Sequence, residues 1–596
     1  MGSMSGEGRG HDPADVAPWL ILAVAAAAGV LVAMIWLGGT LGALVSGAGW
    51  RPPPFSLTLL LRLPDGTEQD WPGVPPLAVW SGIAVTSGAT TALAVPAVTA
   101  GYRWFSRNPG LAGLRDLRGL TPRGAAKVAR RLRPSLSGAK NIPPDQAGML
   151  IGEHNGVELR GSWEDVYLAL MAPRSGKTTA LVAPMAIRAP GAVLLTSRKS
   201  DAYTTTWAPR SARGHLWVFD PQQICHADQD WWWDLLAEAI TVEGARRLSG
   251  HFIACAFSAS ERSNYWALAA SNLLCGLFHA AATSDGTIHD VLDWLANPAD
   301  PAPVEALRQA GAIGLAGDLQ STIRLPAETR GGVYSTAAQT MACLLDPVIS
   351  KWITPDPGKP QFDPEDFVTG SDTLYLFSKK GRGGAAPLVA AFADAVLQAA
   401  ISAAERAGGR NDPPLVAILD EAANIAPIED LPDLYSFLGS LGIPIVTILQ
   451  SYQQGARVWG QAGMDALWGA ATVKVLGAGL DDSDFAEKIS RLIGEHRITE
   501  TSVSHSRQGR SVSHSSRKER IYSAADVRAL PKGTALLLLT GIRAAVITLR
   551  PWMAEPYADR LRAATKRAER DITRRALRKR PQRSPRSRPP TTLSRR

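Results

Sequence analysis

The residues best suited to chemistry form a Gly-Lys-Thr triplet at 176–178, preceded by Ala-Pro-Arg-Ser. Backbone N–H groups beside a glycine can approach phosphate oxygens closely, a lysine can reach the β- and γ-phosphates, and a threonine hydroxyl can ligate Mg²⁺. The expected phosphate-binding residues are Ala172, Pro173, Arg174, Ser175, Gly176, Lys177, Thr178 and Thr179.

This segment matches the end of a Walker A motif, although Met171 stands where the first glycine of that motif usually lies. A Gly-Lys-Thr triplet also occurs by chance in structural turns, so its surroundings decide between the two interpretations. The apolar run 165–172 predicts a buried strand before the loop, and a helix is predicted from Lys177 onward. A nucleotide-binding loop is therefore favoured over a structural turn.

Two adjacent carboxylates, Asp420 and Glu421, end the apolar segment 415–421 in the manner of a Walker B motif. Asp420 would hold Mg²⁺ through water, and Glu421 would polarise the water that attacks the γ-phosphate. Asp-Glu after a strand is often a helix cap instead. The pairing with the loop at 172–179 favours the catalytic interpretation.

Gln450 follows the predicted strand 445–449 and could sense the γ-phosphate and orient water. A surface glutamine without a role is about as common. The sequence thus predicts an ATPase that uses ATP and Mg²⁺. Its expected catalytic residues are Lys177, Glu421 and Gln450, and its expected metal ligands are Thr178 and Asp420.

Strands must carry these residues at one edge of a sheet. Apolar segments predict strands at 165–172, 192–196, 216–219, 373–377, 415–419, 445–449, 472–476 and 535–539, with helices between several of them. Such alternation implies an α/β fold with a largely parallel, helix-covered sheet. Residues 241–329 are rich in Ala and Leu at helical spacing and predict a helical insertion.

Two uncharged stretches predict membrane spans at about 19–37 and 77–100, the second less apolar than the first. A single span followed by a surface segment is the alternative for the second stretch. Ten Lys and Arg against one acid in residues 101–140 place that flank, and the chain after it, in the cytoplasm. The expected location is the inner membrane, with the catalytic part in the cytoplasm.

The net charge of +9 comes from the C-terminus, since residues 560–596 carry fifteen Lys and Arg against two acids. This tail is expected to stay disordered and to attract DNA or anionic lipid, with a solvated, functionless tail as the alternative. Residues 499–520 are rich in Ser and Arg and predict a mobile loop, a hairpin tip or a solvated linker.

The cysteines argue against a zinc or disulfide site, and a run of tryptophans does not favour a base-stacking site. The four cysteines lie singly, at 225, 255, 275 and 343, which supports neither a zinc site nor a disulfide framework. The tryptophans at 231–233 lie beside apolar leucines, so packing is favoured over stacking on nucleic-acid bases.

Taken together, the chain resembles the coupling proteins of type IV secretion systems, the conjugative DNA-pump ATPases, over residues 19 to about 553. The matching segments, in family order, are 174–177, 197–201, 219–221, 419–421 and 449–454. Met171 and Ala172 replace a usual Gly-Pro, and Ser197 replaces an Asp. Gly439 falls where many members place an arginine, so no trans-acting arginine finger is assigned.

The resemblance implies a RecA-like P-loop NTPase domain with an inserted all-α domain and an N-terminal two-helix transmembrane anchor. It also implies a homohexamer whose partners are single-stranded DNA, a relaxase-type DNA–protein complex and secretion-channel proteins. A membrane ATPase that exports only proteins, or a docking scaffold that binds nucleotide without hydrolysis, are the alternatives.

The expected domains follow from these segments. They are a two-span anchor at 1–102, a basic linker at 103–142, the nucleotide-binding domain at 143–240 and 331–555, the all-α insertion at 241–330 and the basic tail at 556–596.

Overall fold

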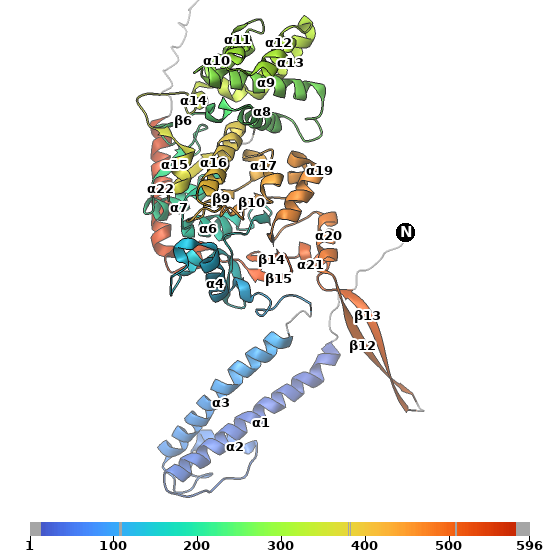
Figure 1. The fold of residues 1–596 in the computed structure, drawn as a ribbon. Helices are drawn as coiled ribbons and strands as arrows, with labels where there is room; N and C mark the ends of the chain where they lie inside the picture. The colour runs from blue at the N-terminus through green and yellow to red at the C-terminus, as the bar shows by residue number, and fades with distance from the viewer. Residues whose placement is uncertain (1–12, 106–109, 380, 382, 507–508, 580–596) are drawn as a thin grey trace, which may run out of the picture. The chain divides into compact units, whose positions relative to one another are not determined.

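The computed structural model describes the chain except residues 1–12, 106–109, 380, 382, 507–508 and 580–596. The side chains of residues 13–27, 93–105 and 498–514 also lie outside the described part. Two compact units are present, an N-terminal unit at Met1–Asn108 and a large unit at Pro109–Arg596, and each is described by itself (Figure 1).

The N-terminal unit is a pair of long helices, α1 (Pro13–Val45) and α3 (Pro76–Phe105), with the short α2 (Thr58–Arg62) between them. The two long helices pack closely because Gly42 of α1 lies directly against the backbone of α3. A Cβ on Gly42 would lie 2.1 Å from the Ala78 carbonyl oxygen. Thr86 also donates a hydrogen bond of 3.0 Å to the Met34 carbonyl oxygen across the pair. Small residues and polar bridges of this kind join helices in membranes.

Among the described residues, three helices are long and apolar enough to cross a membrane. One, Ala28–Val45, lies near the N-terminus and overlaps the predicted span at 19–37, of which residues 19–27 have no described side chains. The other two, at Tyr265–Thr283 and Ala386–Arg406, are mostly buried within the large unit, so we assign them to its core. The predicted span at 77–100 is helical as part of α3, and its membrane role stays a prediction.

An eleven-stranded sheet organises the large unit, in the order β2-β1-β15-β14-β11-β3-β10-β9-β4-β8-β5. The strands from β11 to β5 are parallel, and the four from β2 to β14 are antiparallel additions at one edge. Their bounds in sheet order are Val157–Gly161, Met149–His154, Ile542–Thr548, Thr534–Leu539, Val473–Gly477, Tyr167–Leu170, Ile445–Leu449, Val416–Leu419, Val193–Ser197, Thr373–Phe377 and Leu216–Phe219.

Helices cover both faces of this sheet, so its parallel strands are apolar on both sides. In β3, Leu168 and Leu170 enter the hydrophobic core on one face, whereas Tyr167 and Ala169 enter the core on the other. Strands buried on two faces are continuous apolar runs rather than alternating ones. This is why the parallel strands, from Tyr167–Leu170 to Val473–Gly477, were all predicted from the sequence.

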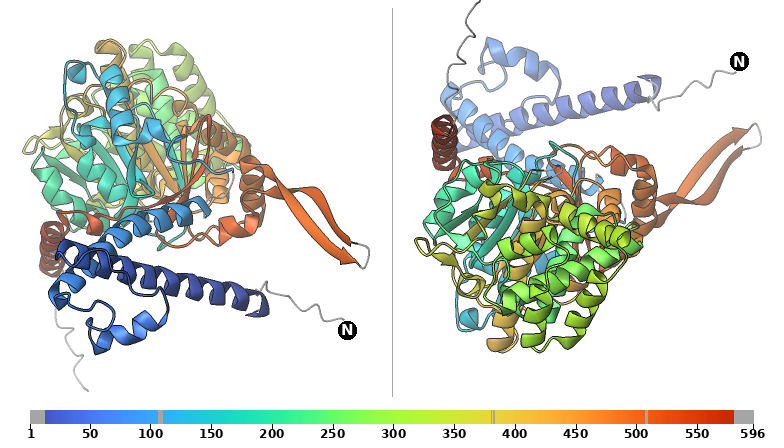
Figure 2. Two further views of the ribbon diagram at one scale, coloured as in Figure 1. Left: turned by 90° about the horizontal axis from the view of Figure 1, so that it is seen from below. Right: turned by 90° about the horizontal axis from the view of Figure 1, so that it is seen from above.

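The antiparallel edge was predicted only in part, since β1, β2 and β15 were missed. Between β1 and β2 the turn is Asn155-Gly156, and both residues have positive φ, 50° and 76°. Asn-Gly with two positive φ angles is the preferred two-residue hairpin turn. The segment at 499–520 is part of a second hairpin, β12 (Glu495–Ser506) with β13 (Gly509–Arg520), which extends away from the sheet (Figures 1 and 2).

The predicted helical insertion is present and continues beyond residue 330. It contains α8 (Val242–Ala256), α9 (Tyr265–Thr283), α10 (Ile288–Ala296), α11 (Ala302–Gln309), α12 (Ile313–Ile323), α13 (Ala327–Thr340) and α14 (Pro347–Ser350). Residues 234–360 are all described, and no strand forms among them. These helices gather at one end of the large unit (Figure 1).

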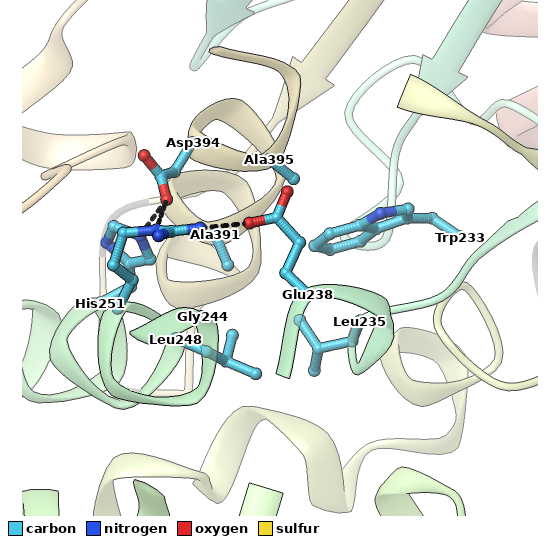
Figure 3. Close-up of a pocket in the computed structure, with 10 residues that line it drawn as sticks. Trp233, Leu235, Glu238, Gly244, Leu248, His251, Ala391, Asp394 and Ala395 are labelled. Atoms are coloured by element: carbon cyan, nitrogen blue, oxygen red, sulfur yellow. Dashed lines mark hydrogen bonds and ion pairs between the residues drawn. The ribbon is translucent and has the colours of Figure 1, made fainter. Parts of the chain in front are cut away.

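Charged side chains join α8 to the sheet-covering helix α16 (Ala386–Arg406) at a small cavity (Figure 3). Asp394 lies 3.3 Å from Arg247 Nε and 3.2 Å from His251 Nε2. Burial alone would raise the pKa of Asp394, but His251 and Arg247 hold it below its ordinary value. Beside these charged side chains, the ring of Trp233 stacks on that of Phe392, with 4.1 Å between the ring centroids. This contact confirms the prediction that the tryptophans at 231–233 have a packing role.

The basic tail is not disordered at its start. Residues Ala558–Arg578 form helix α22, which packs along α7 (Asp201–Ser211), so the prediction of disorder from residue 560 is wrong as far as residue 578. Leu561, Ala568 and Ile572 form one apolar stripe at helical spacing; Leu561 and Ile572 contact hydrophobic clusters, and Ala568 between them is buried. The prediction weighed total charge and overlooked this stripe. Residues 580–596 lie outside the described part.

Candidate functional site

The loop after β3 has the backbone shape of an anion site. Arg174 and Gly176 have positive φ angles of 63° and 92°, and Ser175 donates both its backbone N–H and its hydroxyl to the Ala172 carbonyl oxygen. Successive N–H groups in such left-handed turns form a concave surface for anions. The helix expected from Lys177 begins with a π-helical turn, Thr178–Val182, and continues as α6 (Ala183–Arg188).

The backbone conformation at position 176 favours glycine, and the lack of a side chain there leaves room for a ligand. The φ angle of Gly176 is positive, which favours glycine. A Cβ at this position would meet only the Thr179 hydroxyl oxygen, at 3.6 Å. Thr179 donates its hydroxyl to the Gly176 carbonyl oxygen at 3.0 Å, so this side chain shapes the turn. Pro173 and Arg174 are exposed.

Met171, the departure from the usual glycine, is accommodated by Gly477 at the end of the neighbouring strand β11. Its side chain is fully buried, and its N–H donates to the Leu449 carbonyl oxygen at 3.0 Å. A Cβ on Gly477 would lie 2.8 Å from the Met171 side chain, and a Cβ on Gly479 would lie 2.7 Å from Ala172. The two glycines therefore leave room for the loop, and no local pattern in the sequence indicates their role.

Lys177, Asp420 and Glu421 meet at the carboxyl ends of the parallel strands. Lys177 Nζ lies 3.3 Å from Asp420 Oδ1 and 3.1 Å from Glu421 Oε1. The strands that precede them, β3 and β9, are not adjacent in the sheet, because β10 lies between them. The carboxyl end of a parallel sheet is the usual place for ligands in such folds.

Gln450 follows β10 and therefore enters the site between the two strands. Its side chain contributes a hydrogen bond that lowers the pKa of Glu421. Its backbone N–H donates to Gln454 Oε1 at 2.9 Å, which fixes the turn into α19 (Tyr452–Ala470). The structure thus brings Gln450 beside the carboxylate with which it was expected to act.

The backbone at Glu421 is strained. This residue has φ 54° and ψ 40°, the left-handed region that a side chain with a Cβ rarely adopts. Its neighbour Asp420 accepts a hydrogen bond on its carbonyl oxygen from the Thr196 hydroxyl at 3.3 Å. Strained residues of this kind cluster at functional sites, where surrounding structure holds them in place.

The two carboxylates differ in acidity. Burial, aided by the negative charge of Glu421, raises the pKa of Asp420 to about 6, although Lys177 opposes the change. Burial would also raise the pKa of Glu421, but Lys177, Arg198 and Gln450 together hold it below its ordinary value. Glu421 is therefore ionised at neutral pH, and Asp420 titrates near the physiological range.

Arg198 is a site residue that the prediction did not include. It follows β4, the strand beside β9, and its Nε lies 3.4 Å from Glu421 Oε2. The Glu421 carboxylate is thus held by Lys177 at one oxygen and by Arg198 at the other. The sequence marks 197–201 only as a motif. The contact between Arg198 and Glu421 depends on the pairing of β4 with β9, which no local pattern shows.

Asp220, from another of the matching segments, has a structural role. Its buried carboxylate accepts the backbone N–H groups of Ile224, Cys225 and Ala227 at 2.6, 2.8 and 3.1 Å. This interaction fixes the loop after β5, away from Lys177.

The site fits a metal that is bound partly by its substrate. Among the described residues, no group of three or more His, Cys, Asp or Glu side chains could hold a metal ion. Buried Asp420 Oδ1 accepts no hydrogen bond from the described residues, and its one charged partner is Lys177. Mg²⁺ commonly uses one or two carboxylates together with substrate phosphates and water. Asp420 and the Thr178 hydroxyl are suited to that arrangement.

Comparisons with known proteins concern the fold and one segment of the chain. Residues 414–532 match the family described as "TraM recognition site of TraD and TraG". No curated protein matches the sequence. This match supports the resemblance to type IV coupling proteins over residues 414–532.

Three solved structures are similar over most of the chain. The unbound monoclinic form of the bacterial conjugative coupling protein TrwBdeltaN70 has a TM-score of 0.51 at 17% identity, with 73% of this chain and 93% of that chain covered. The same values hold for plasmid coupling protein TrwB in complex with the non-hydrolysable GTP analogue GDPNP. A trigonal form of TrwBdeltaN70 with sulphate gives 0.50 at 18% identity, covering 73% and 94%. The predicted RecA-like fold is confirmed.

Proposed function

We propose that this chain is a membrane-anchored ATPase of the type IV secretion pathway. It would couple ATP hydrolysis to recruitment and translocation of single-stranded DNA, or of DNA–protein complexes, into a conjugation channel. The observation that carries the proposal is the convergence of Lys177, Asp420 and Glu421 beside a left-handed phosphate loop.

In this account Lys177 exchanges partners during each cycle. Without nucleotide it neutralises the two carboxylates at 3.3 and 3.1 Å, and with ATP it binds the β- and γ-phosphates instead. When bound, Mg²⁺ neutralises charge that develops on the phosphates. Glu421, freed from Lys177, polarises the attacking water, and Gln450 orients that water. Thr178 and Asp420 hold the metal.

Anchoring in the inner membrane is supported by α1, whose segment Ala28–Val45 is long and apolar enough to span a bilayer. A second span in α3 is supported by its close packing against α1 at Gly42 and by the hydrogen bond from Thr86. The basic flank at 101–140 favours a cytoplasmic ATPase unit.

The proposed partners come from the comparisons. The match of residues 414–532 to a TraM recognition site supports docking of a DNA–protein complex, and the likeness to conjugative coupling proteins supports DNA as cargo. By the same resemblance, the large units would assemble as a homohexamer with ATP between subunits, single-stranded DNA at the centre and secretion-channel proteins beyond.

The full chain, purified in detergent or nanodiscs, tests the proposal through its ATPase rate with and without single-stranded DNA across a salt series. We expect stimulation by DNA that declines as salt competes for the phosphates. Hydrolysis indifferent to DNA would point to a motor that exports only proteins. ATP binding without hydrolysis would point to a docking scaffold. The Glu421→Gln variant provides the background rate.

A further inference from the structure

The outward face of α22 is strongly basic, although the helix itself is firmly docked. Ala558–Arg578 and Lys579 carry nine Lys and Arg and three acids. Residues 560–596 carry a net charge of +13, whereas the whole chain carries +9. The rest of the chain therefore has a net negative charge. This helix and the residues after it are therefore one of two strongly basic segments of the chain, the other being the flank at 101–140.

Contacts along its whole length fix α22 to the large unit. Leu561 packs in a hydrophobic cluster with Trp552 and Ile187, and the Ala564 carbonyl oxygen accepts a hydrogen bond from Trp207 Nε1 at 3.3 Å. At the C-terminal end, Lys579 Nζ donates to the carbonyl oxygens of His226 and Ala227 at 3.1 and 2.9 Å. The helix is therefore an ordered part of the surface of the large unit rather than a solvated tail.

Five cations point away from the docked side and keep their charge available. Arg560, Lys566, Arg567, Arg570 and Arg578 are exposed, and among the residues that the structure describes no carboxylate lies within ion-pair distance of them. At 3.6 residues per turn, Arg560, Arg567 and Arg578 fall within about 20° of one another around the helix. They form a stripe about 27 Å long, which corresponds to about eight successive phosphates of one DNA strand.

We propose that this stripe of α22 binds the phosphate backbone of double-stranded DNA independently of sequence. The inference goes beyond the proposed function, because it needs neither ATP hydrolysis nor the strand that is translocated. It places duplex DNA that flanks the cargo on the outside of the large unit, on a surface separate from the nucleotide site.

Two observations favour duplex DNA over other phosphate-bearing partners. The apolar stripe of Leu561, Ala568 and Ile572 is already used for docking, so α22 has no free apolar face to bury in a bilayer, as interfacial helices require. Leu577 is the one large apolar side chain exposed on the described helix. The helix also has no aromatic residue between Ala558 and Arg578 on which unstacked bases could stack, as single-strand binders require.

The test compares two triple variants of the full chain in nanodiscs of neutral lipid, without nucleotide. One is Arg560→Gln with Arg567→Gln and Arg578→Gln, which removes the whole stripe. The matched control removes three exposed cations from α4 (Pro122–Leu132), by Arg123→Gln, Lys127→Gln and Arg131→Gln. Binding to a 30-base-pair duplex is measured across a salt series, and binding to phosphatidylserine vesicles is measured by flotation.

We expect the α22 variant to bind the duplex about tenfold or more weakly at low salt, and its log–log salt slope to fall by about 2 to 3, since each lost phosphate contact removes about 0.9. The control should keep the slope of the parent. An unchanged slope in the α22 variant, or a loss confined to the vesicles, would overturn the proposal. Retained ATPase activity stimulated by single-stranded DNA shows that the variants are folded, and its absence in the parent would count against the proposed function alone.

Discussion

Lys177 Nζ lies 3.1 Å from Glu421 Oε1, so the lysine suited to bind phosphate is paired with the carboxylate suited to activate water. While they are paired, each neutralises the charge of the other. A nucleotide triphosphate would offer Lys177 a stronger set of negative charges and separate the pair. In the proposed mechanism, binding of the substrate would therefore also free Glu421 to act as the base.

Replacement of Lys177 by alanine removes the charge that moves to the phosphates. We expect Lys177→Ala to lower kcat/KM for ATP by about 10²-fold or more, together with loss of ATP-induced thermal stabilisation. Lys127→Ala, which removes an exposed lysine on α4, is the control and should match the parent. Normal ATP binding by Lys177→Ala would exclude this lysine from the site.

Glu421→Gln should separate binding from turnover. The amide keeps the size of the side chain but cannot polarise water, so kcat should fall by about 10²- to 10⁴-fold while ATP stays bound. Single-turnover assays and retention of labelled ATP measure the two steps. Turnover equal to that of the parent would remove Glu421 from its proposed role.

Asp420 should make the nucleotide-free protein less stable at neutral pH. Its folded pKa, raised to about 6, lies above its ordinary value, so its contribution to stability is full below about pH 4 and is lost as pH rises through about 6. Asp420→Asn avoids the buried charge, and we expect it to raise the melting temperature by about 2 °C at pH 7.5 and by less at pH 5.

Glu421→Gln is the opposite-sign control for that experiment. The pKa of Glu421 lies below its ordinary value, so ionisation of this group stabilises the fold above its unfolded pKa and the stability is lost as pH falls through the folded pKa. The glutamine variant should therefore melt lower than the parent at pH 7.5. If both variants shift the melting temperature in the same direction at every pH, the two carboxylates do not differ as described.

Arg198 should act as a positioning residue through the acidity of Glu421. Loss of its charge, 3.4 Å from Glu421 Oε2, should raise the pKa of that carboxyl, so the acid limb of the ATPase pH profile should move to higher pH in Arg198→Ala. Arg198→Lys should restore part of the shift. Lys199→Ala, at the adjacent exposed position, controls for charge at this turn. An acid limb that stays in place in Arg198→Ala would contradict the contact.

The sequence predicted those parts of the fold whose physical signal is local. Each parallel strand is a short apolar run because helices cover both of its faces. Gly176 lies in the loop after one such run, and the Asp420–Glu421 pair directly follows another. The edge strands β1 and β2 contain more polar residues, so their clearest signal was the Asn155-Gly156 turn between them, which was overlooked. In α22 the charge concealed the stripe that begins at Leu561.

Other parts of the site depend on the order of strands in space, which no local pattern contains. Arg198 meets Glu421 because β4 lies beside β9, and Gln450 enters the site because β10 lies between β3 and β9. Gly477 matters because β11 pairs with β3 and receives the Met171 side chain. Arg198 and Glu421 are 223 positions apart in the chain, and Met171 and Gly477 are 306 positions apart.

The most direct test of the central claim is a structure of the Glu421→Gln chain with ATP and Mg²⁺. The account predicts that Lys177 Nζ leaves the 421 side chain for the β- and γ-phosphate oxygens, with the metal beside Thr178 and Asp420. A triphosphate bound elsewhere, or a Lys177 that still contacts only positions 420 and 421, would contradict it.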